Sequence, residues 1–365
     1  MVEWKKLGEV CSFNRGRTIT SKDAIDGEIP VIAGGQTPSY YHNEANRIGE
    51  SITIAGSGAY AGFVAYWNQP IFVSDAFTVD PTDSLLHKYL FYWLKKHQEK
   101  VFATQKGAGV PHVHGKDIAS FCIPIPSLSE QQRIVGILDI FTSSIDNLKQ
   151  QIEQRRKQYD YYREKLIDVN EGPEARLITL GEIGSFEKGS GIQKKDFVEE
   201  GVGCIHYGQI HTYYGLSTSE TISNISKEQA KKCKKAQCGD IIIATTSEDV
   251  EGCAKAVAWL GNHEICISGD SLVFHHKENP KFIAYLFRMN YFQKFKRGRC
   301  TGAKVTRISA KALSDYPFVL PIKSKQAEIV SSLNIFEASI RNLEEQLNLR
   351  EKQYEYYRNK LLTFE

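Results

Sequence analysis

The chain has 365 residues, of which 41% are hydrophobic and 24% are charged, and its formal net charge is +3. This length allows a sizeable core and favours two domains or more. There is no apolar run of the ~18 residues that a membrane span needs and no basic-then-apolar signal peptide, so we expect a cytoplasmic protein with no membrane partner.

The eight cysteines are scattered and include no C-x-x-C pair. In a reducing compartment they are expected to be small buried side chains and not a disulfide framework. The mild positive charge does not exclude nucleic acid as a partner, because a binding face can be basic while the rest of the surface is acidic.

Residues 1–128 are predicted to form a globular α+β domain. The segments "SITIAGSGAYAGFVAYW" (51–67) and "PIFVSDAFTV" (70–79) have the composition of strands and are separated by Gly-rich turns. The segment "SLLHKYLFYWLKKHQEKVF" (84–102) has the apolar spacing of an amphipathic helix.

A long helix is predicted over residues 129–168. Apolar side chains recur there at alternating steps of four and three residues, from Ile134 to Leu166, which is the heptad pattern of a helix that packs one seam against a partner. Pro124 and Pro126 precede the helix, and Ser129 is its expected N-cap. About 36 residues at ~1.5 Å each would make a rod of roughly 54 Å.

After a linker at 169–176, a second globular domain is predicted at 177–323 and a second long helix at 324–365, with Ser324 as its N-cap. The domain repeats the order of elements in the first. Strands are expected at "GDIIIATTS", "AKAVAWL" and "HEICISGDSLVF" (239–274), and a helix at "PKFIAYLFRMNYFQKF" (280–295).

The two halves are a tandem duplication. The stretch from 130 to 167 aligns without gaps with 325 to 362, so that "KQYDYYREKL" falls on "KQYEYYRNKL". At the same spacing, "GAGVPHVHGKDI" (107–118) falls on "GAKVTRISAKAL" (302–313). Near the two starts, "WKKLGEVCSFNRG" (from Trp4) matches "LITLGEIGSFEKG" (from Leu177) at a shorter offset, so the second copy is longer between its similar ends.

Neither helix can bury its seam alone, so we predict that the two pair as an antiparallel coiled coil with pseudo-two-fold symmetry. Arg155 and Arg350 interrupt the seam at the same place. Either they extend to solvent, or they mark a docking surface for another subunit together with off-seam residues such as Tyr161 and Tyr356. The predicted helix-pairing residues are Ile134, Leu138, Phe141, Ile145, Leu148, Ile152, Tyr159, Tyr162, Leu166, Ile329, Leu333, Phe336, Ile340, Leu343, Leu347, Tyr354, Tyr357 and Leu361.

No catalytic residue and no metal ligand is predicted. "GSGAYAG" (56–62) resembles a dinucleotide-binding loop but is followed by a strand, so the helix N-terminus that would hold a pyrophosphate is missing. His112, His114 and the pair His275-His276 have no cysteine or carboxylate at ligand spacing. The acidic stretch 248–251 with Lys255 lacks the spacing of a nuclease triad, and the amino-methyltransferase tetrapeptide Asn-Pro-Pro-aromatic does not occur.

Loops in both halves mix Gly, Thr or Ser, Arg or Lys, and aromatic residues. This composition suits nucleic acid, because Arg and Lys bind phosphates and guanine while Gln and Asn bind adenine. Ordinary surface loops are expected to account for a share of these residues, and the equivalent Asp75 and Asp270 are expected to serve in turns or caps. The candidate DNA-binding residues are Arg15, Arg17, Thr18, Thr20, Gln36, Tyr40, Ser57, Tyr60, Lys106, His112, His114, Lys188, Lys194, Tyr207, Gln209, His211, Tyr213, Thr245, Thr246, Arg297, Arg299, Lys304 and Arg307.

Each globular unit opens on "LGE", closes on a proline-bounded strand and leads into a helix that ends in a Tyr-rich segment. Together with "SEQQRIV" (129–135), this organisation resembles the specificity subunit of type I restriction–modification systems over essentially the full chain. The second copy departs from it with "SKQAEIV" (324–330), and Leu177 stands where the first copy has Trp4. Neither departure disturbs the heptads.

The resemblance implies two target recognition domains that each read one half of a split DNA site, and long helices that separate them and bind two methyltransferase subunits. It implies no cofactor for this chain, because methyl transfer from S-adenosylmethionine and the ATP- and Mg-dependent activity of restriction subunits belong to partners. A rod of roughly 54 Å predicts a site of about 16 base pairs at ~3.4 Å each. The alternatives are a self-contained methyltransferase or nuclease, and a coiled-coil scaffold that does not bind DNA.

Overall fold

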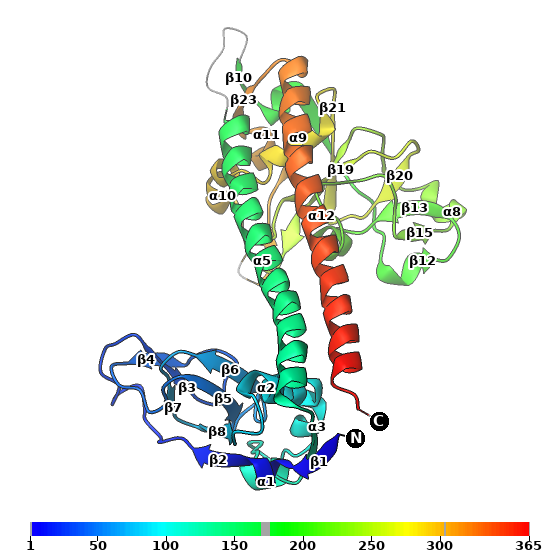
Figure 1. The fold of residues 1–365 in the computed structure, drawn as a ribbon. Helices are drawn as coiled ribbons and strands as arrows, with labels where there is room; N and C mark the ends of the chain where they lie inside the picture. Colours follow the sequence, from blue (N-terminus) through cyan, green and yellow to red (C-terminus); the bar gives the residue numbers. More distant parts are fainter. Residues whose placement is uncertain (1, 169–175, 303, 365) are drawn as a thin grey trace. The chain divides into compact units, whose positions relative to one another are not determined.

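The computed structural model describes residues 2–168, 176–302 and 304–364. The chain forms two compact units: unit 1 comprises Met1–Gln150 and Glu344–Glu365, and unit 2 comprises Gln151–Leu343 (Figure 1). The division therefore runs through both long helices, and not through the predicted boundaries at their starts. Of the predicted linker 169–176, only Arg176 lies within the described residues, and it begins a strand.

Unit 1 has a four-stranded sheet in the order β2-β8-β5-β6 and a three-stranded sheet in the order β4-β3-β7, and β1 pairs with β9. Its elements are β1 (Glu3–Lys6), α1 (Leu7–Val10), β2 (Cys11–Arg15), β3 (Ile29–Ile32), β4 (Tyr40–His42), β5 (Glu50–Ala55), β6 (Val64–Asn68), β7 (Phe72–Val73), β8 (Ala76–Pro81), α2 (His87–Lys96), α3 (Gln98–Phe102), α4 (Gly115–Ile118) and β9 (Cys122–Ile125). The start of α5 (Leu128–Ile167) and the end of α12 (Lys323–Leu361) complete it.

Unit 2 has two five-stranded sheets, in the orders β11-β21-β17-β19-β14 and β12-β15-β13-β20-β16, and the pairs β10-β23 and β18-β22. Its strands are β10 (Arg176–Thr179), β11 (Gly184–Lys188), β12 (Phe197–Val198), β13 (Val202–Ile205), β14 (Ser217–Thr218), β15 (Ser223–Ile225), β16 (Lys235–Ala236), β17 (Ile241–Ala244), β18 (Thr246–Ser247), β19 (Lys255–Trp259), β20 (Ile265–Ile267), β21 (Ser271–His276), β22 (Thr306–Arg307) and β23 (Pro317–Leu320). Its shorter helices are α6 (Leu180–Ile183), η1 (Lys194–Asp196), α7 (Tyr207–Thr212), α8 (Lys227–Ala230), α9 (Pro280–Leu286), α10 (Asn290–Arg297) and α11 (Ala310–Ser314).

The topology confirms the α+β class and the tandem duplication. The order β2-β8-β5-β6 of unit 1 recurs as β11-β21-β17-β19 in unit 2, and the pair β1-β9 recurs as β10-β23. The three-stranded sheet β4-β3-β7 of unit 1 recurs as β15-β13-β20, with one antiparallel and one parallel pair in each, and the longer second copy adds β12 and β16 at the edges of this sheet. The two units therefore share the same framework of paired strands and differ in the strands added to it.

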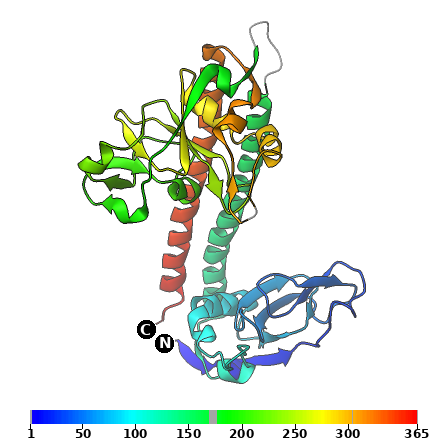
Figure 2. The same cartoon turned by 180° about the vertical axis from the view of Figure 1, so that it is seen from behind.

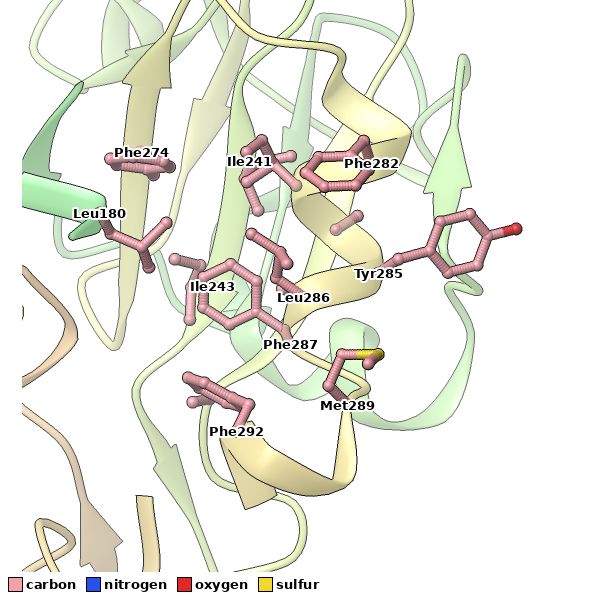
Figure 3. Close-up of a cluster of buried hydrophobic side chains, with 14 of the residues drawn as sticks. Leu180, Ile241, Ile243, Phe274, Phe282, Tyr285, Leu286, Phe287, Met289 and Phe292 are labelled. Carbon is pink, nitrogen blue, oxygen red and sulfur yellow. The ribbon is translucent and has the colours of Figure 1, made fainter. Parts of the chain in front are cut away.

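The core of unit 2 forms where one face of a sheet meets α9. Ile241 and Ile243 on β17 are fully buried against Phe282 and Leu286 of α9, and Figure 3 shows these side chains converging. Burial of each such side chain contributes roughly 1.5–3 kcal/mol to stability. The start of α9 is fixed by Asn279, whose side chain accepts the N–H groups of Lys281 and Phe282, and by Pro280 at the first helical position.

Two predicted helices are each broken into two. The predicted helix 84–102 is α2 and α3, which are separated at His97. The predicted helix 280–295 is α9 and α10, and the N–H of Asn290 at the start of α10 donates to the carboxylate of Glu164 at 3.1 Å. This partner lies far away in the sequence, so the helical periodicity gave no sign of the break.

A buried glutamine attaches the start of each long helix to its own unit. Gln131 is fully buried; its Oε1 accepts the N–H of Leu86 at 2.9 Å, and its Nε2 donates to the carbonyls of Ser84 and Pro126 at 2.9 and 3.0 Å. Its equivalent Gln326 accepts the N–H of Asn279 at 2.9 Å and donates to Pro321 and Glu278 at 2.8 and 2.7 Å. We call these two residues the glutamine latches.

The predicted N-caps are wrong by a short distance. Ser129 and Ser324 lie inside the first turns of α5 and α12. At the start of α5 the capping hydroxyl is that of Ser127, which accepts the N–H of Glu130 at 3.3 Å.

Within each unit, α5 and α12 run side by side and antiparallel, as Figures 1 and 2 show. In unit 1 the ring of Phe141 stacks on Tyr357, with centroids 5.3 Å apart, and Lys149 pairs with Glu351 at 3.4 Å. In unit 2, Tyr162 stacks on Phe336, also at 5.3 Å. As the residue number increases along α5, the number of the contacting residue on α12 decreases, which confirms the predicted antiparallel pairing.

The hydroxyl of Tyr159 on α5 donates to Glu337 on α12 at 2.9 Å within unit 2. Burial, and then the charge of Glu337, raises the pKa of Tyr159 to about 12. The hydroxyl is therefore protonated at neutral pH and can act as the donor.

The predicted seam is buried unevenly. Its first positions on each helix pack into the core of a globular unit: Ile134 and Leu138 in unit 1, Ile329 and Leu333 in unit 2. The tyrosines at its far ends, Tyr162 and Tyr357, are each 40% exposed although their rings stack on the facing helix. The remaining predicted positions are buried or half-buried, namely Phe141, Ile145, Leu148, Ile152, Tyr159, Leu166, Phe336, Ile340, Leu343, Leu347, Tyr354 and Leu361.

Each seam arginine lies over an aromatic ring of the facing helix. The guanidinium of Arg155 is 5.9 Å from the ring centroid of Phe336, and that of Arg350 is 5.6 Å from Phe141. A cation over a ring face is attracted by the ring's quadrupole. The arginines therefore contribute to the pairing itself, which neither of the two sequence interpretations had foreseen.

The end of α12 belongs to the core of unit 1. Leu362 is 2% exposed and packs in the same cluster as Leu7 and Leu90. Lys96 at the end of α2 donates to the carbonyl of Asn359 at 3.2 Å and to the hydroxyl of Thr363 at 2.6 Å. Residues from both ends of the sequence thus build one unit.

All eight cysteines are free. The prediction that they are buried is wrong for Cys122 and Cys238, which are exposed, and Cys233 and Cys300 are half-buried. In the described ranges, no helix is both long enough and apolar enough to span a bilayer.

Candidate nucleic-acid interface

Each unit contains a polar cavity at the corresponding place of its frame. Cavity A in unit 1 has a volume of about 200 Å³, and cavity B in unit 2 about 580 Å³. Their linings match position by position in the aligned repeats: Phe13 with Phe186, Arg15 with Lys188, Asp75 with Asp270, Phe77 with Leu272, and His112 with Arg307.

One wall of each cavity is built by the same pair of strands. On β2, Arg15 lies opposite Phe77 of β8, and on β11, Lys188 lies opposite Leu272 of β21. In both units the cation stands at the last residue of its strand and is exposed. The strand end therefore presents a positive charge at the rim.

The opposite wall is a short hairpin, which we call the rim hairpin: residues 106–112 in unit 1, and residues 301–302 and 304–307 in unit 2. Lys106 and His112 exchange backbone hydrogen bonds of 2.9 and 2.8 Å, as do Thr301 and Arg307. Each hairpin pairs with a neighbouring loop, through Ser57 opposite His112 and through Thr246 opposite Arg307.

A glycine with positive φ makes the turn of each rim hairpin possible. The φ of Gly107 is +116° and that of Gly302 is +105°. A Cβ on Gly302 would lie 2.1 Å from the carbonyl oxygen of Val305, so a side chain is excluded there. The repeated glycine of the two rim hairpins is thus explained by backbone geometry.

The electrostatic character of both rims suits an anionic ligand. Arg15, Lys188 and Arg307 are exposed, and among the described residues none of them pairs with a carboxylate. His112 and His114 stack nearly parallel, with centroids 6.5 Å apart. Unpaired cations beside a groove are the usual means of holding phosphates, and arginine also reads guanine.

Some candidates near the rims have partners within the protein. Lys106 pairs with Asp117 at 2.7 Å, and this hydrogen bond, more than any other cause, lowers the pKa of Asp117. The carboxylate of Asp75 accepts the hydroxyl of Ser57, and the backbone carbonyl of Asp270 accepts the N–H and hydroxyl of Thr245 at 2.9 and 2.8 Å. Both aspartates therefore hold neighbouring loops, and neither caps a helix.

A third cavity, cavity C, adjoins the rim hairpin of unit 2 and has a volume of about 770 Å³. Thr246 lines both cavity B and cavity C, while Arg307 faces the first and Val305 the second. Among the candidates, Lys194, Tyr207, Gln209 and His211 line cavity C.

Two of these candidates have structural roles that the sequence did not reveal. The amide of Gln209 accepts the N–H of His206 at 3.0 Å and donates to the hydroxyl of Ser223 at 2.6 Å, which stabilises the start of α7. The ring of His211 lies 2.9 Å from the carbonyl of Thr246.

The remaining candidates do not gather at the three cavities. Several are held by internal contacts: Arg17 lies over Phe72, Thr20 donates to Asp23, Tyr40 donates to the carbonyl of Ile19, Arg297 pairs with Glu251, and Arg299 lies over Phe295. Others are exposed without contributing to a cavity lining, namely Thr18, Gln36, Tyr60, Tyr213 and Lys304. Sequence reasoning missed Lys116, which lines cavity A only four residues after His112.

The described residues contain no group of three or more His, Cys, Asp or Glu side chains placed to hold a metal ion. His276 is half-buried and desolvation lowers its pKa to about 4, while His275 is also half-buried and its Nδ1 lies 2.9 Å from the carboxylate of Asp240. The described sites offer cations, hydroxyl groups and aromatic ring edges. These groups can bind a polar ligand and discriminate between ligands of different shape and hydrogen-bonding pattern.

The helix pair carries a second type of surface, which occurs once in each unit. In unit 1, Ile140 is 69% exposed beside Phe141, on which Tyr357 stacks; in unit 2, Ile335 is 69% exposed beside Phe336. Tyr161 and Tyr356 are 59% and 60% exposed, each in contact with its neighbouring tyrosine. We call these the two aromatic patches.

Three comparisons with known proteins agree with this geometry. The family model of the type I restriction modification DNA specificity domain matches residues 1–155 and 174–350. The specificity subunit of a type I restriction enzyme of Escherichia coli is 27% identical over 391 residues, covering 100% of this chain and 94% of that protein. In fold, the chain is similar to the S subunit of a type I restriction-modification system from Mycoplasma genitalium, with a TM-score of 0.63 at 18% identity, covering 100% of this chain and 97% of that one. The chain therefore belongs to the family of type I restriction–modification DNA specificity subunits.

Proposed function

We propose that this chain is the non-catalytic subunit that reads a bipartite, asymmetric DNA target for a type I restriction–modification complex. The observation that carries the proposal is the duplicated cavity with unpaired rim cations, one in each unit. Because His112 and His114 of cavity A are replaced by Arg307 and Ser309 in cavity B, the two half-sites should differ in sequence.

In this proposal the chemistry lies with partner subunits. Two methyltransferase subunits would transfer the methyl group of S-adenosylmethionine to adenine, and restriction subunits would supply the ATP- and Mg-dependent activity. The chain itself would contribute the reading surfaces and the docking surfaces. The helices α5 and α12, of 40 and 39 residues, would set the distance between the two half-sites.

The test is to map methylated adenines in DNA that has been exposed to the chain together with its methyltransferase partner. The expected pattern is two short, different sequences separated by a spacer without sequence preference. A single contiguous site would contradict the two-reader proposal. Transfer of the methyl label by the purified chain alone would contradict its non-catalytic role.

Replacing one rim cation at a time should relax one half-site at a time. We expect Arg15→Ala to weaken discrimination in the half-site of unit 1, and Arg307→Ala to do so in the half-site of unit 2, by roughly tenfold at the affected base pair if the arginine reads guanine. Methylation of libraries randomised in each half-site measures this. Arg133→Ala is the matched control, since Arg133 pairs with Glu130 on α5 at 2.6 Å. Relaxation of the same half-site by both variants would contradict the assignment.

The two aromatic patches are proposed as equivalent docking surfaces for the two methyltransferase subunits. Each presents an exposed isoleucine and tyrosine pair, a combination that a monomer would not normally expose and that aromatic-rich interfaces use as anchors.

We therefore expect Ile140→Lys, or equally Ile335→Lys, to reduce the stoichiometry from two methyltransferase subunits per chain to one, because each change places a charge in only one patch. Mass measurement of the assembled complex tests this. The control is Lys157→Ala, on the solvated part of α5, which should retain two. The variant that carries both Ile140→Lys and Ile335→Lys should bind no methyltransferase subunit. If it still binds two, these docking surfaces are refuted.

A further inference from the structure

An acidic loop lies inside the otherwise basic reading region of unit 2. It spans residues 248–254 between β18 and β19, and Glu248, Asp249 and Glu251 line cavity C together with Val305 of the rim hairpin. Carboxylates at a surface that faces phosphates cost binding energy through repulsion. The presence of three carboxylates at cavity C therefore calls for a functional explanation.

The loop is held in one conformation by internal bonds. Asp249 accepts the N–H of Gly252 at 2.6 Å, and Glu251 pairs with Arg297 at 3.2 Å. The buried Lys296 donates to the backbone carbonyls of Glu251 and Cys253 at 2.7 and 2.8 Å. The loop is therefore preorganised, and two of its three carboxylates are engaged in this organisation.

Glu248 is the exception. It is exposed, it follows β18 directly, and among the described residues its carboxylate has no hydrogen-bond or ionic partner. Through β18 it is attached to the strand pair that places Arg307, since Thr246 lies opposite Arg307. Glu248 therefore lines cavity C directly after the strand pair that carries Arg307 of cavity B.

A second polar group at the same place also lacks a partner. Thr246 is only 5% exposed, lines cavities B and C, and its hydroxyl oxygen has no hydrogen-bond partner among the described residues. An unpaired buried hydroxyl is unfavourable, and a ligand that forms a hydrogen bond with it removes this cost. Both groups therefore point to a ligand with hydrogen-bond donors at this part of the surface.

Duplex DNA offers a carboxylate only a few partners. Phosphates repel it, and guanine presents acceptors in the major groove. Adenine carries its amino group beside the acceptor N7, which also repels a carboxylate, whereas cytosine presents its N4 amino group as a donor without an acceptor of its own. A glutamate that enters the groove therefore selects cytosine.

We propose that Glu248 is a specificity-determining residue that accepts a hydrogen bond from the N4 amino group of one cytosine in the half-site read by unit 2. This inference rests on the proposed function. It applies to one unit only, because the loop 56–62 that occupies the corresponding place in unit 1, "GSGAYAG", contains no acidic residue. The carboxylate would thus contribute to the difference between the half-sites.

The experiment replaces each cytosine of the mapped target in turn by 2-pyrimidinone, which lacks the amino group, and each adenine by purine, which lacks its own. Binding of the full chain with its methyltransferase partner is measured for wild type, Glu248→Ala and Glu248→Gln. For wild type, loss of one cytosine amino group in the half-site of unit 2 should weaken binding roughly tenfold or more. Glu248→Ala should bind the normal and the modified duplex equally at that position.

A second measurement, the affinity for random duplex DNA, should change in the opposite direction. Removal of a negative charge that faces phosphates should raise the affinity for random duplex DNA, so Glu248→Ala should gain nonspecific affinity while it loses specific affinity. Glu200→Gln, an exposed carboxylate of unit 2 that lines none of the three cavities, is the matched control and should leave both the cytosine effect and discrimination unchanged. Equal thermal unfolding of the variants would exclude a folding defect.

The inference is overturned if Glu248→Ala still discriminates at every cytosine, or if the lost discrimination concerns an adenine or the half-site of unit 1. These results leave the proposed function standing, provided that the wild type prefers its mapped target. If the wild type with its partner prefers no sequence at all, the proposed function itself fails.

Discussion

Replacing Gln131 by alanine should lower the free energy of unfolding of unit 1 by about 3 kcal/mol or more, since each buried partner left unpaired costs about 1–3 kcal/mol. The amide of this glutamine latch bonds three backbone groups, of Leu86, Ser84 and Pro126, in a site without solvent. Gln326→Ala should do the same to unit 2. Chemical denaturation of the full chain, with hydrogen exchange to show which unit opens, measures both effects.

The neighbouring Gln132 provides the control. It is exposed one position further along α5, so Gln132→Ala should change stability by less than about 0.5 kcal/mol. Gln131→Glu is a sharper variant, because an ionised carboxylate can accept the N–H of Leu86 but cannot donate to the two carbonyls. Comparable stability of the Gln131 and Gln132 variants would show that the latch does not stabilise the unit.

Lengthening both long helices by one heptad should move the preferred spacer between the half-sites by about 3 base pairs, because seven residues add ~10.5 Å of helix and a base pair occupies ~3.4 Å. The insertion would duplicate residues 148–154 in α5 and 343–349 in α12. A heptad keeps the same face of each helix on the seam, so the pairing can be retained. Methylation of a target series with stepwise longer spacers measures the shift.

A heptad inserted into α5 alone is the matched control. It places the seam of one helix out of register with the other, so it should impair the protein without selecting a new spacer. An unchanged spacer preference in the correctly paired double insertion would contradict the role of the helices as a ruler.

The repeat and the heptads were sufficient to predict the α+β class, the duplicated frame and the antiparallel helices. Each of these depends on patterns within one stretch of chain or on the similarity of two stretches, both of which the sequence displays. Loop composition put Arg15, Lys188, His112 and Arg307 into one candidate set, and the structure places them at equivalent positions of the two cavities because equivalent positions of a duplicated frame come to equivalent places.

What the sequence could not reveal depends on partners that are distant along the chain. The break between α9 and α10 follows a bond from Asn290 to Glu164, and the amide of Gln209 is engaged by Ser223. Composition assigned Gln209 to base reading and dismissed the acidic loop 248–251. Only the packed structure shows that Glu248 alone in this loop has a free carboxylate.

The placement of Leu362 and Thr363 in unit 1 has a consequence for synthesis. A ribosome releases the first 150 residues long before it reaches the end of the chain, yet the core that they form includes side chains from the last few residues. Unit 2 consists of one continuous segment of the chain, Gln151–Leu343, so it can complete its core first. Unit 1 must keep part of its apolar surface open until Leu362 has been synthesised, so a chain that stops before this residue would lack part of the core of its first unit as well.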